Sequence, residues 1–77
     1  MPRWEYGTYS YGSNNLNAPW SVFIGPDGNR REIPREAVTR ILTALGREGW
    51  EVIGIDSQQD KDYNHDSTMF LLKRVLD

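Results

Sequence analysis

The sequence predicts an α+β fold, a small antiparallel sheet of three to five strands packed on one α-helix, in the order strand, β-hairpin, helix, strand, strand. One stretch, residues 34 to 48, has the apolar period of a helix. Other stretches alternate with the two-residue period of strands or are rich in aromatic and β-branched residues. A chain of 77 residues has the length of one domain, so residues 1–77 are expected to form a single domain.

The first element is a strand over residues 3 to 11, R-W-E-Y-G-T-Y-S-Y, in which aromatic residues dominate. Side chains two positions apart share a face of a strand. The predicted faces carry Trp4, Tyr6 and Thr8 on one side and Tyr9 and Tyr11 on the other.

Residues 12 to 33 are expected to form a loop followed by a β-hairpin, inserted before the helix. The hairpin strands would be W-S-V-F-I at 20 to 24 and N-R-R-E-I at 29 to 33. G-P-D-G between them is typical of a turn, because proline fixes φ and Asp-Gly tolerates left-handed backbone.

The helix is expected over residues 34 to 48. Pro34 suits a first helical position, where no N–H is needed. The apolar stripe has helical spacing and consists of Val38, Ile41, Leu42 and Leu45. Gly49 follows as the expected left-handed residue that ends the helix.

Two further strands are expected at residues 50 to 56 and 68 to 75, joined by a polar loop over 57 to 67. Both strands are apolar on both faces, yet one helix covers only one face of a sheet. Ile53, Ile55, Met69 and Leu71 therefore need a second cover. Either the hairpin or register and twist provide it within the chain, or these residues form the interface of a homo-oligomer, which we favour.

Composition limits the possible functions. The net charge of −2 argues against a nucleic-acid-binding protein, which is usually basic. The absence of cysteine excludes disulfides and thiolate chemistry. No apolar run approaches the ~20 residues of a membrane span, and the N-terminus has no signal region, so we expect a cytoplasmic location.

The loop D-K-D-Y-N-H-D has the spacing of calcium ligands at Asp60, Asp62 and Asn64. However, His65 stands where the turn of such a site needs glycine, and Leu71 stands where the bidentate glutamate belongs. We therefore expect a solvated loop, no metal site and no resident cofactor. His65 beside Asp66 lacks a nucleophile at any recognisable motif, which argues against an enzyme.

A basic cluster surrounds the end of the hairpin and the start of the helix, close to aromatic residues. Arginine side chains bind anions through two parallel hydrogen bonds, and aromatic rings stack on planar ligands. The alternative is a solvated face whose arginines pair with Glu32 and Glu36. The candidate ligand-binding residues are Arg30, Arg31, Arg35, Arg40, Tyr9, Tyr11 and Trp20.

Three short motifs also resemble a known family. W-E-Y at residues 4 to 6, L-x-x-L-G-x-E-G-W-E-V at 42 to 52 and L-L-K-R at 71 to 74 resemble the small bacterial and phage proteins of the domain of unknown function family 4177. The resemblance implies a strand, a helix and two antiparallel strands, and no enzymatic activity. Residues 12 to 33 depart from the short connection that this family leads us to expect.

Together these observations predict a non-enzymatic, homo-oligomeric binding protein that holds an anionic, nucleotide-like ligand at its subunit interfaces. Small phage proteins that sequester the nucleotide signals of bacterial immunity offer an analogy for this function. The alternative is a structural or adaptor module that docks another protein through its apolar sheet face.

Overall fold

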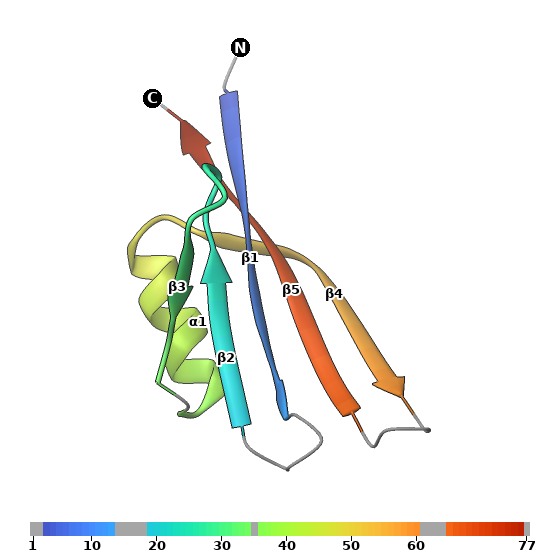
Figure 1. Cartoon of the computed structure of the whole chain (residues 1–77). Coiled ribbons are helices and arrows are strands. Elements are labelled where there is room, and N and C mark those ends of the chain that lie inside the picture. Colours follow the sequence, from blue (N-terminus) through green and yellow to red (C-terminus); the bar gives the residue numbers. More distant parts are fainter. Residues whose placement is uncertain (1–2, 14–18, 35, 61–64, 77) are drawn as a thin grey trace.

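The structure is a computed structural model, which describes residues 3–13, 19–34, 36–60 and 65–76. Within these ranges, antiparallel strands form one sheet in the order β3-β2-β1-β5-β4 (Figure 1). The elements are β1 (Arg3–Ser13), β2 (Pro19–Ile24), β3 (Arg30–Glu32), α1 (Val38–Arg47), β4 (Glu51–Asp60) and β5 (His65–Leu76).

The predicted α+β class is wrong, because the fold is a small β-rich one in which one sheet dominates a single short helix. β1 and β5 contain 11 and 12 residues, whereas α1 contains 10. β4 and β5 also continue through much of the expected polar loop, with Ser57 paired to Thr68 and Asp60 to His65. The ladder between strands is made by backbone groups, so polar residues can extend a hairpin that apolar residues have already aligned.

The hairpin predicted between residues 20 and 33 is confirmed. β2 and β3 are antiparallel, with Phe23 opposite Arg31. The Gly28 N–H donates to the Gly25 carbonyl oxygen at 3.0 Å, and Gly28 has a φ of 81°. The G-P-D-G turn therefore uses the left-handed backbone that glycine tolerates.

The helix begins at Val38 rather than at Pro34 as expected. The Ile33 N–H donates to the Ser21 carbonyl oxygen at 3.1 Å, and the Ser21 hydroxyl donates to the Ile33 carbonyl oxygen at 2.6 Å. These two bonds hold the chain beside β2 after β3 ends, and Ala37 is still extended, with a ψ of 130°. The helix thus starts where its apolar stripe starts.

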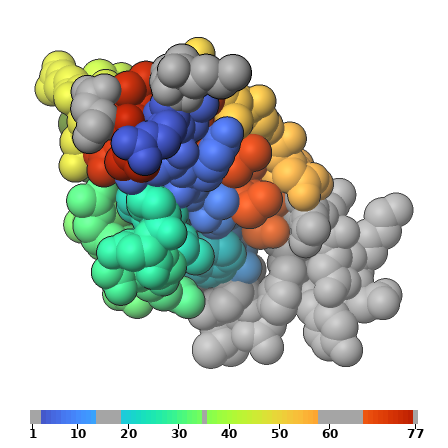
Figure 2. All heavy atoms as spheres, turned by 90° about the horizontal axis from the view of Figure 1, so that it is seen from above, coloured from blue at the N-terminus to red at the C-terminus, as the bar shows by residue number. Residues whose placement is uncertain are grey.

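The core lies between α1 and one face of the sheet. Ile41 and Leu45 of the helix pack against strand residues, and α1 lies to one side of the sheet, next to β2 and β3 (Figure 1). In the view along the strands, the yellow-green helix residues lie at the left (Figure 2). The strand residues of this core are Tyr9, Phe23, Phe70 and Leu72, joined by Trp50.

The helix ends as the sequence predicts, at Gly49, which has a φ of 97°. The Gly49 N–H donates to the Gly46 carbonyl oxygen and the Trp50 N–H to the Leu45 carbonyl oxygen, both at 3.0 Å. This pair of bonds is the Schellman motif, which satisfies the last carbonyl groups of a helix. It also turns Trp50 into the core. Among the described residues, no helix has the length and apolar character that crossing a membrane requires.

Replacing Gly46 and Gly49 by alanine is expected to change the stability of the protein in opposite directions. A Cβ atom at Gly46 would meet nothing within 4 Å, so we expect Gly46→Ala to stabilise the protein by roughly 1 kcal/mol. Gly49→Ala should instead cost about 1–2 kcal/mol, because alanine is strained at a positive φ. Urea unfolding of both variants measures these changes, and equal shifts of the two midpoints would contradict the proposed role of Gly49.

Candidate functional site

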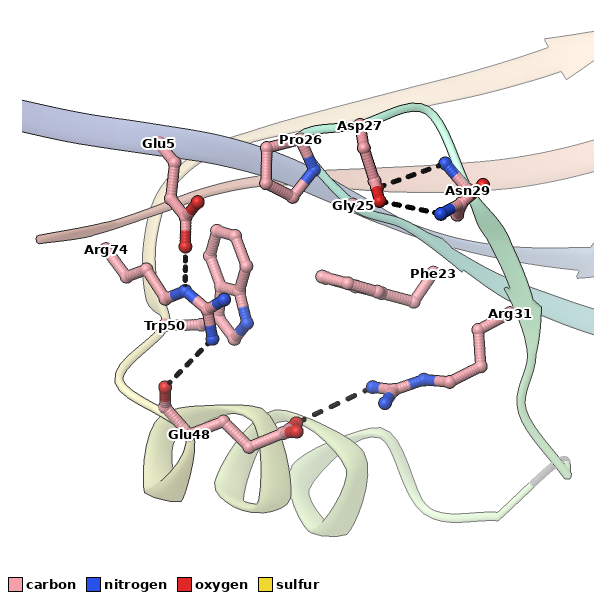
Figure 3. A pocket seen from close by; sticks show the side chains of 10 residues that line it. All are labelled: Glu5, Phe23, Gly25, Pro26, Asp27, Asn29, Arg31, Glu48, Trp50 and Arg74. Atoms are coloured by element: carbon pink, nitrogen blue, oxygen red, sulfur yellow. Dashed lines mark hydrogen bonds and ion pairs between the residues drawn. The ribbon is translucent and has the colours of Figure 1, made fainter. Parts of the chain in front are cut away.

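A cavity of about 600 Å³ opens between the end of α1 and the β2–β3 turn (Figure 3). This volume falls within the range of small-molecule sites. Side chains from four strands and from the C-terminal end of the helix line it. The lining residues are Glu5, Phe23, Gly25, Pro26, Asp27, Asn29, Arg31, Glu48, Trp50 and Arg74.

Two aromatic rings form the centre of this site, and one arginine lies over each. The Trp50 and Phe23 rings meet edge to face, with centroids 5.3 Å apart and planes at 66°. The Arg74 guanidinium lies 4.4 Å from the Trp50 ring centroid, and the Arg31 guanidinium lies 5.2 Å from the Phe23 centroid. Cation–π contacts of this kind stabilise the cations and cover the ring faces.

Two acidic residues, Glu5 and Glu48, contact these arginines. Arg74 donates from Nε to Glu5, its partner across β1 and β5. Its Nη1 donates to the Glu48 carbonyl oxygen at 3.3 Å, and the Glu48 carboxylate lies 3.5 Å from Arg31. Figure 3 shows these contacts linking the sheet to the helix end. We call this set the Trp50 cluster, which consists of Glu5, Phe23, Arg31, Glu48, Trp50 and Arg74.

The Trp50 cluster offers little to a planar anion. Phe23 and Trp50 are 7% and 6% exposed, so neither ring has a free face. Both arginines have carboxylate partners. Asp27 adds a further negative charge, and its two oxygens accept hydrogen bonds from Asn29 at 3.3 and 2.6 Å. We conclude that this cluster ties the helix end to the sheet.

The predicted basic cluster is not assembled in the described structure. Arg31 faces the helix side of the sheet with Phe23, whereas Arg30 pairs with Ile24 on the opposite face. Arg40 is exposed on the helix. Arg35 lies outside the described residues.

The predicted stacking residues do not share one face of the sheet. Tyr9 is fully buried and stacks on Phe70, with centroids 6.1 Å apart and planes at 17°. Tyr11 packs against the same core. Trp20 pairs with Gly12 on the face opposite the helix, so its ring cannot act together with the two tyrosines.

The second feature of the molecule is the face of the sheet opposite α1, which we call the open face. Strand pairing assigns residues to it: Thr8 pairs with both Ile24 and Leu71, and Tyr6 pairs with Lys73. The large apolar side chains exposed on this face are Trp4 39%, Tyr6 51%, Ile24 37%, Met69 40%, Leu71 39% and Val75 46%.

A β-bulge divides the four residues that the sequence places in one interface. The pairing of β4 with β5 shifts register between Val52 and Gly54. Ile55 consequently pairs with Phe70 on the helix side, and Ile53 shares that side by alternation. Met69 and Leu71 lie on the open face, so the expectation of one shared face is corrected. All four side chains are exposed, from 39% for Leu71 to 65% for Ile55.

Sequence reasoning left Trp4, Tyr6, Val75 and Ile24 out of the interface. The signal for three of them was present, because two-residue alternation already placed Trp4 beside Tyr6, and Val75 beside Met69 and Leu71. What it lacked was the pairing of β1 with β5, which joins these two rows into one patch.

The other candidate chemistry receives no structural support. Asp62 and Asn64 lie outside the described residues, and the described residues hold no group of acidic, histidine or cysteine side chains able to bind a metal ion. His65 pairs with Asp60 as a strand residue, and its side chain is outside the described part of the chain.

Comparisons with family models, curated proteins and solved structures gave no match. The resemblance to family 4177 therefore stays a prediction.

Proposed function

We propose that this protein is a non-enzymatic binding module that assembles with a second copy of itself through the open face. One observation carries the proposal: six large apolar side chains, each 37% to 51% exposed, lie together on a sheet face that no described element covers. If each exposes roughly 40% of about 200 Å², the patch is on the order of 500 Å², as large as the largest patches on ordinary monomers.

The composition of the patch supports a protein partner. Trp4, Tyr6 and Met69 are of residue types enriched at interfaces. The one charged side chain between them, Lys73, lies with its Nζ 4.1 Å from the Trp4 ring centroid. Other charged residues of this face stand on the edge strands, with Arg30 on β3 and Asp56 on β4. An apolar centre with a polar rim is the usual anatomy of an interface.

A second copy is the simplest occupant. A two-fold dimer places the same patch on both sides, so each apolar row meets apolar side chains. A chain this short also buries only about 60% of its unfolded surface, and association adds burial that its core cannot provide. The anionic ligand forms no part of this proposal, since the described arginines are dispersed. The cytoplasmic location expected from the sequence is kept as part of this proposal.

Leu71→Glu tests the proposal. We expect the wild-type protein to associate and the variant to lose that association, because a carboxylate at the centre of the patch would be buried without a partner. Sedimentation velocity and native mass spectrometry give the subunit number. Thr39→Glu, which adds the same charge at an exposed helix position, is the matched control and should associate normally.

A wild-type protein that is monomeric at every accessible concentration would overturn self-assembly. The same apolar face would then support the adaptor function, in which another protein covers it.

A further inference from the structure

The sheet has two edges within the described residues, and they differ in protection. β3 contains three residues, all exposed and all charged, Arg30, Arg31 and Glu32. Short, charged edges resist pairing with other strands. β4 at the other edge contains ten residues, with no proline or lysine to block an added strand. Its exposed apolar side chains are Val52 37%, Ile53 43% and Ile55 65%.

An apolar row that crosses the sheet ends at this edge. On the helix side, Phe23 pairs with Tyr9, Tyr9 with Phe70, and Phe70 with Ile55. The first three are buried, but Ile55 lies beyond the cover of α1 and is 65% exposed. A further strand beside β4 would continue this row and shield Ile55.

Pairing of β4 with a second β4 allows few registers. Residues directly opposite each other in an antiparallel pair point to the same face of the sheet. A two-fold axis between the strands must therefore place one residue opposite its own copy, and not opposite the next residue in the chain. A centre at Gly54 brings the bulge between Val52 and Gly54 into the new ladder. A centre at Asp56 places two carboxylates opposite each other, which is destabilising.

A centre at Ile55 avoids both problems. Ile55 then stands opposite its own copy, Ile53 opposite Ser57, and Gly54 opposite Asp56. The bulge residue, Ile53, then lies at the end of this five-residue ladder and not in its middle. Ile53 of each copy becomes the diagonal neighbour of Ile55 of the other, so four isoleucines meet on the helix side.

We propose that β4 pairs with β4 of a second copy, antiparallel and centred on Ile55, joining two five-stranded sheets into one. The interface uses β4 and the helix side of the sheet edge, whereas the proposed function uses the open face, so either can hold without the other. If the two two-fold axes cross at right angles, the two interfaces together close into a tetramer.

Single cysteines test the register, because the chain has no cysteine of its own. Ile55→Cys places two thiols directly opposite each other in the proposed pair. We expect mild oxidation to give a disulfide-linked dimer on the order of 100-fold faster than random collision, owing to the high effective concentration. Asp56→Cys is the matched control, since position 56 faces Gly54 and should cross-link slowly.

Equal rates for the two cysteine variants, or faster linkage of Asp56→Cys, would overturn the proposed register. Ile55→Lys supplies a second measurement, because it introduces a charge where the isoleucines meet. We expect it to halve the subunit number seen by native mass spectrometry, and an unchanged number would overturn the interface. A β4 edge that binds an extended peptide but no second copy would also overturn it.

Leu71→Glu separates the two proposals. In that background, Ile55→Cys should still cross-link rapidly if the β4 pair exists. Loss of open-face association with retained cross-linking supports the β4 pair alone, whereas failure of cross-linking in both backgrounds removes only the β4 pair.

Discussion

Trp50→Ala is expected to destabilise the protein by about 3–5 kcal/mol, the cost of removing a large buried aromatic side chain. Trp50 is 6% exposed and contacts both Phe23 and Arg74. Removing it opens a void beneath the helix end and takes away the ring on which the Arg74 guanidinium lies. A domain of this size has little stability to lose, so the variant should be largely unfolded at the temperatures where the wild type is folded.

Urea unfolding followed by circular dichroism measures this loss. Val52→Ala is the control, because Val52 lies two residues further along the chain but is 37% exposed. We expect it to cost well under half as much as Trp50→Ala. A Trp50→Ala protein with a near wild-type midpoint would mean that the Trp50 cluster does not hold the helix end to the sheet.

The Trp50 cluster also shows where sequence reasoning stopped. Arg74 and Glu5 are 69 residues apart in the chain and become neighbours only through the pairing of β1 with β5. Periodicity reports which residues share a face of one element, and it contains no information on which strands are adjacent. The arginines were therefore grouped mainly by proximity in sequence, and the contacts of Arg74 with Glu5 and Trp50 were not predicted.

Local signals did predict local structure. The apolar stripe from Val38 to Leu45 and the left-handed Gly49 lie where the sequence places them, because both depend on nearby residues. The start of the helix was wrong because the Ser21 hydroxyl reaches Ile33 across twelve positions of the chain. Contacts of that range have no periodic signature.

The β-bulge at Ile53 caused the largest error in the predicted faces of the sheet. Strict two-residue alternation continues through residues 50 to 56, and it grouped Ile53 and Ile55 with the uncovered face. One extra residue in β4 reverses the face of everything after it. The fold class failed for a related reason, since the polar residues after Asp56 continue as strand through backbone pairing that composition does not reveal.

Leu71 and Leu72 offer the sharpest separation of fold from assembly, because adjacent strand residues point to opposite faces. Leu72 is 1% exposed and belongs to the core, whereas Leu71 is 39% exposed on the open face. We expect Leu72→Ala to cost about 2–5 kcal/mol at any protein concentration, since it leaves a cavity in the core.

Leu71→Ala should behave differently. In dilute solution, where copies separate, its cost should be within about 0.5 kcal/mol of zero. At high concentration the stability of the variant should fall below that of the wild type. Association stabilises the folded state by mass action, and the variant loses part of that stabilisation. Urea midpoints at two concentrations give both numbers. A Leu71→Ala cost that is large and independent of concentration would mean that this side chain supports the fold of one copy, and the open face would then no longer argue for a partner.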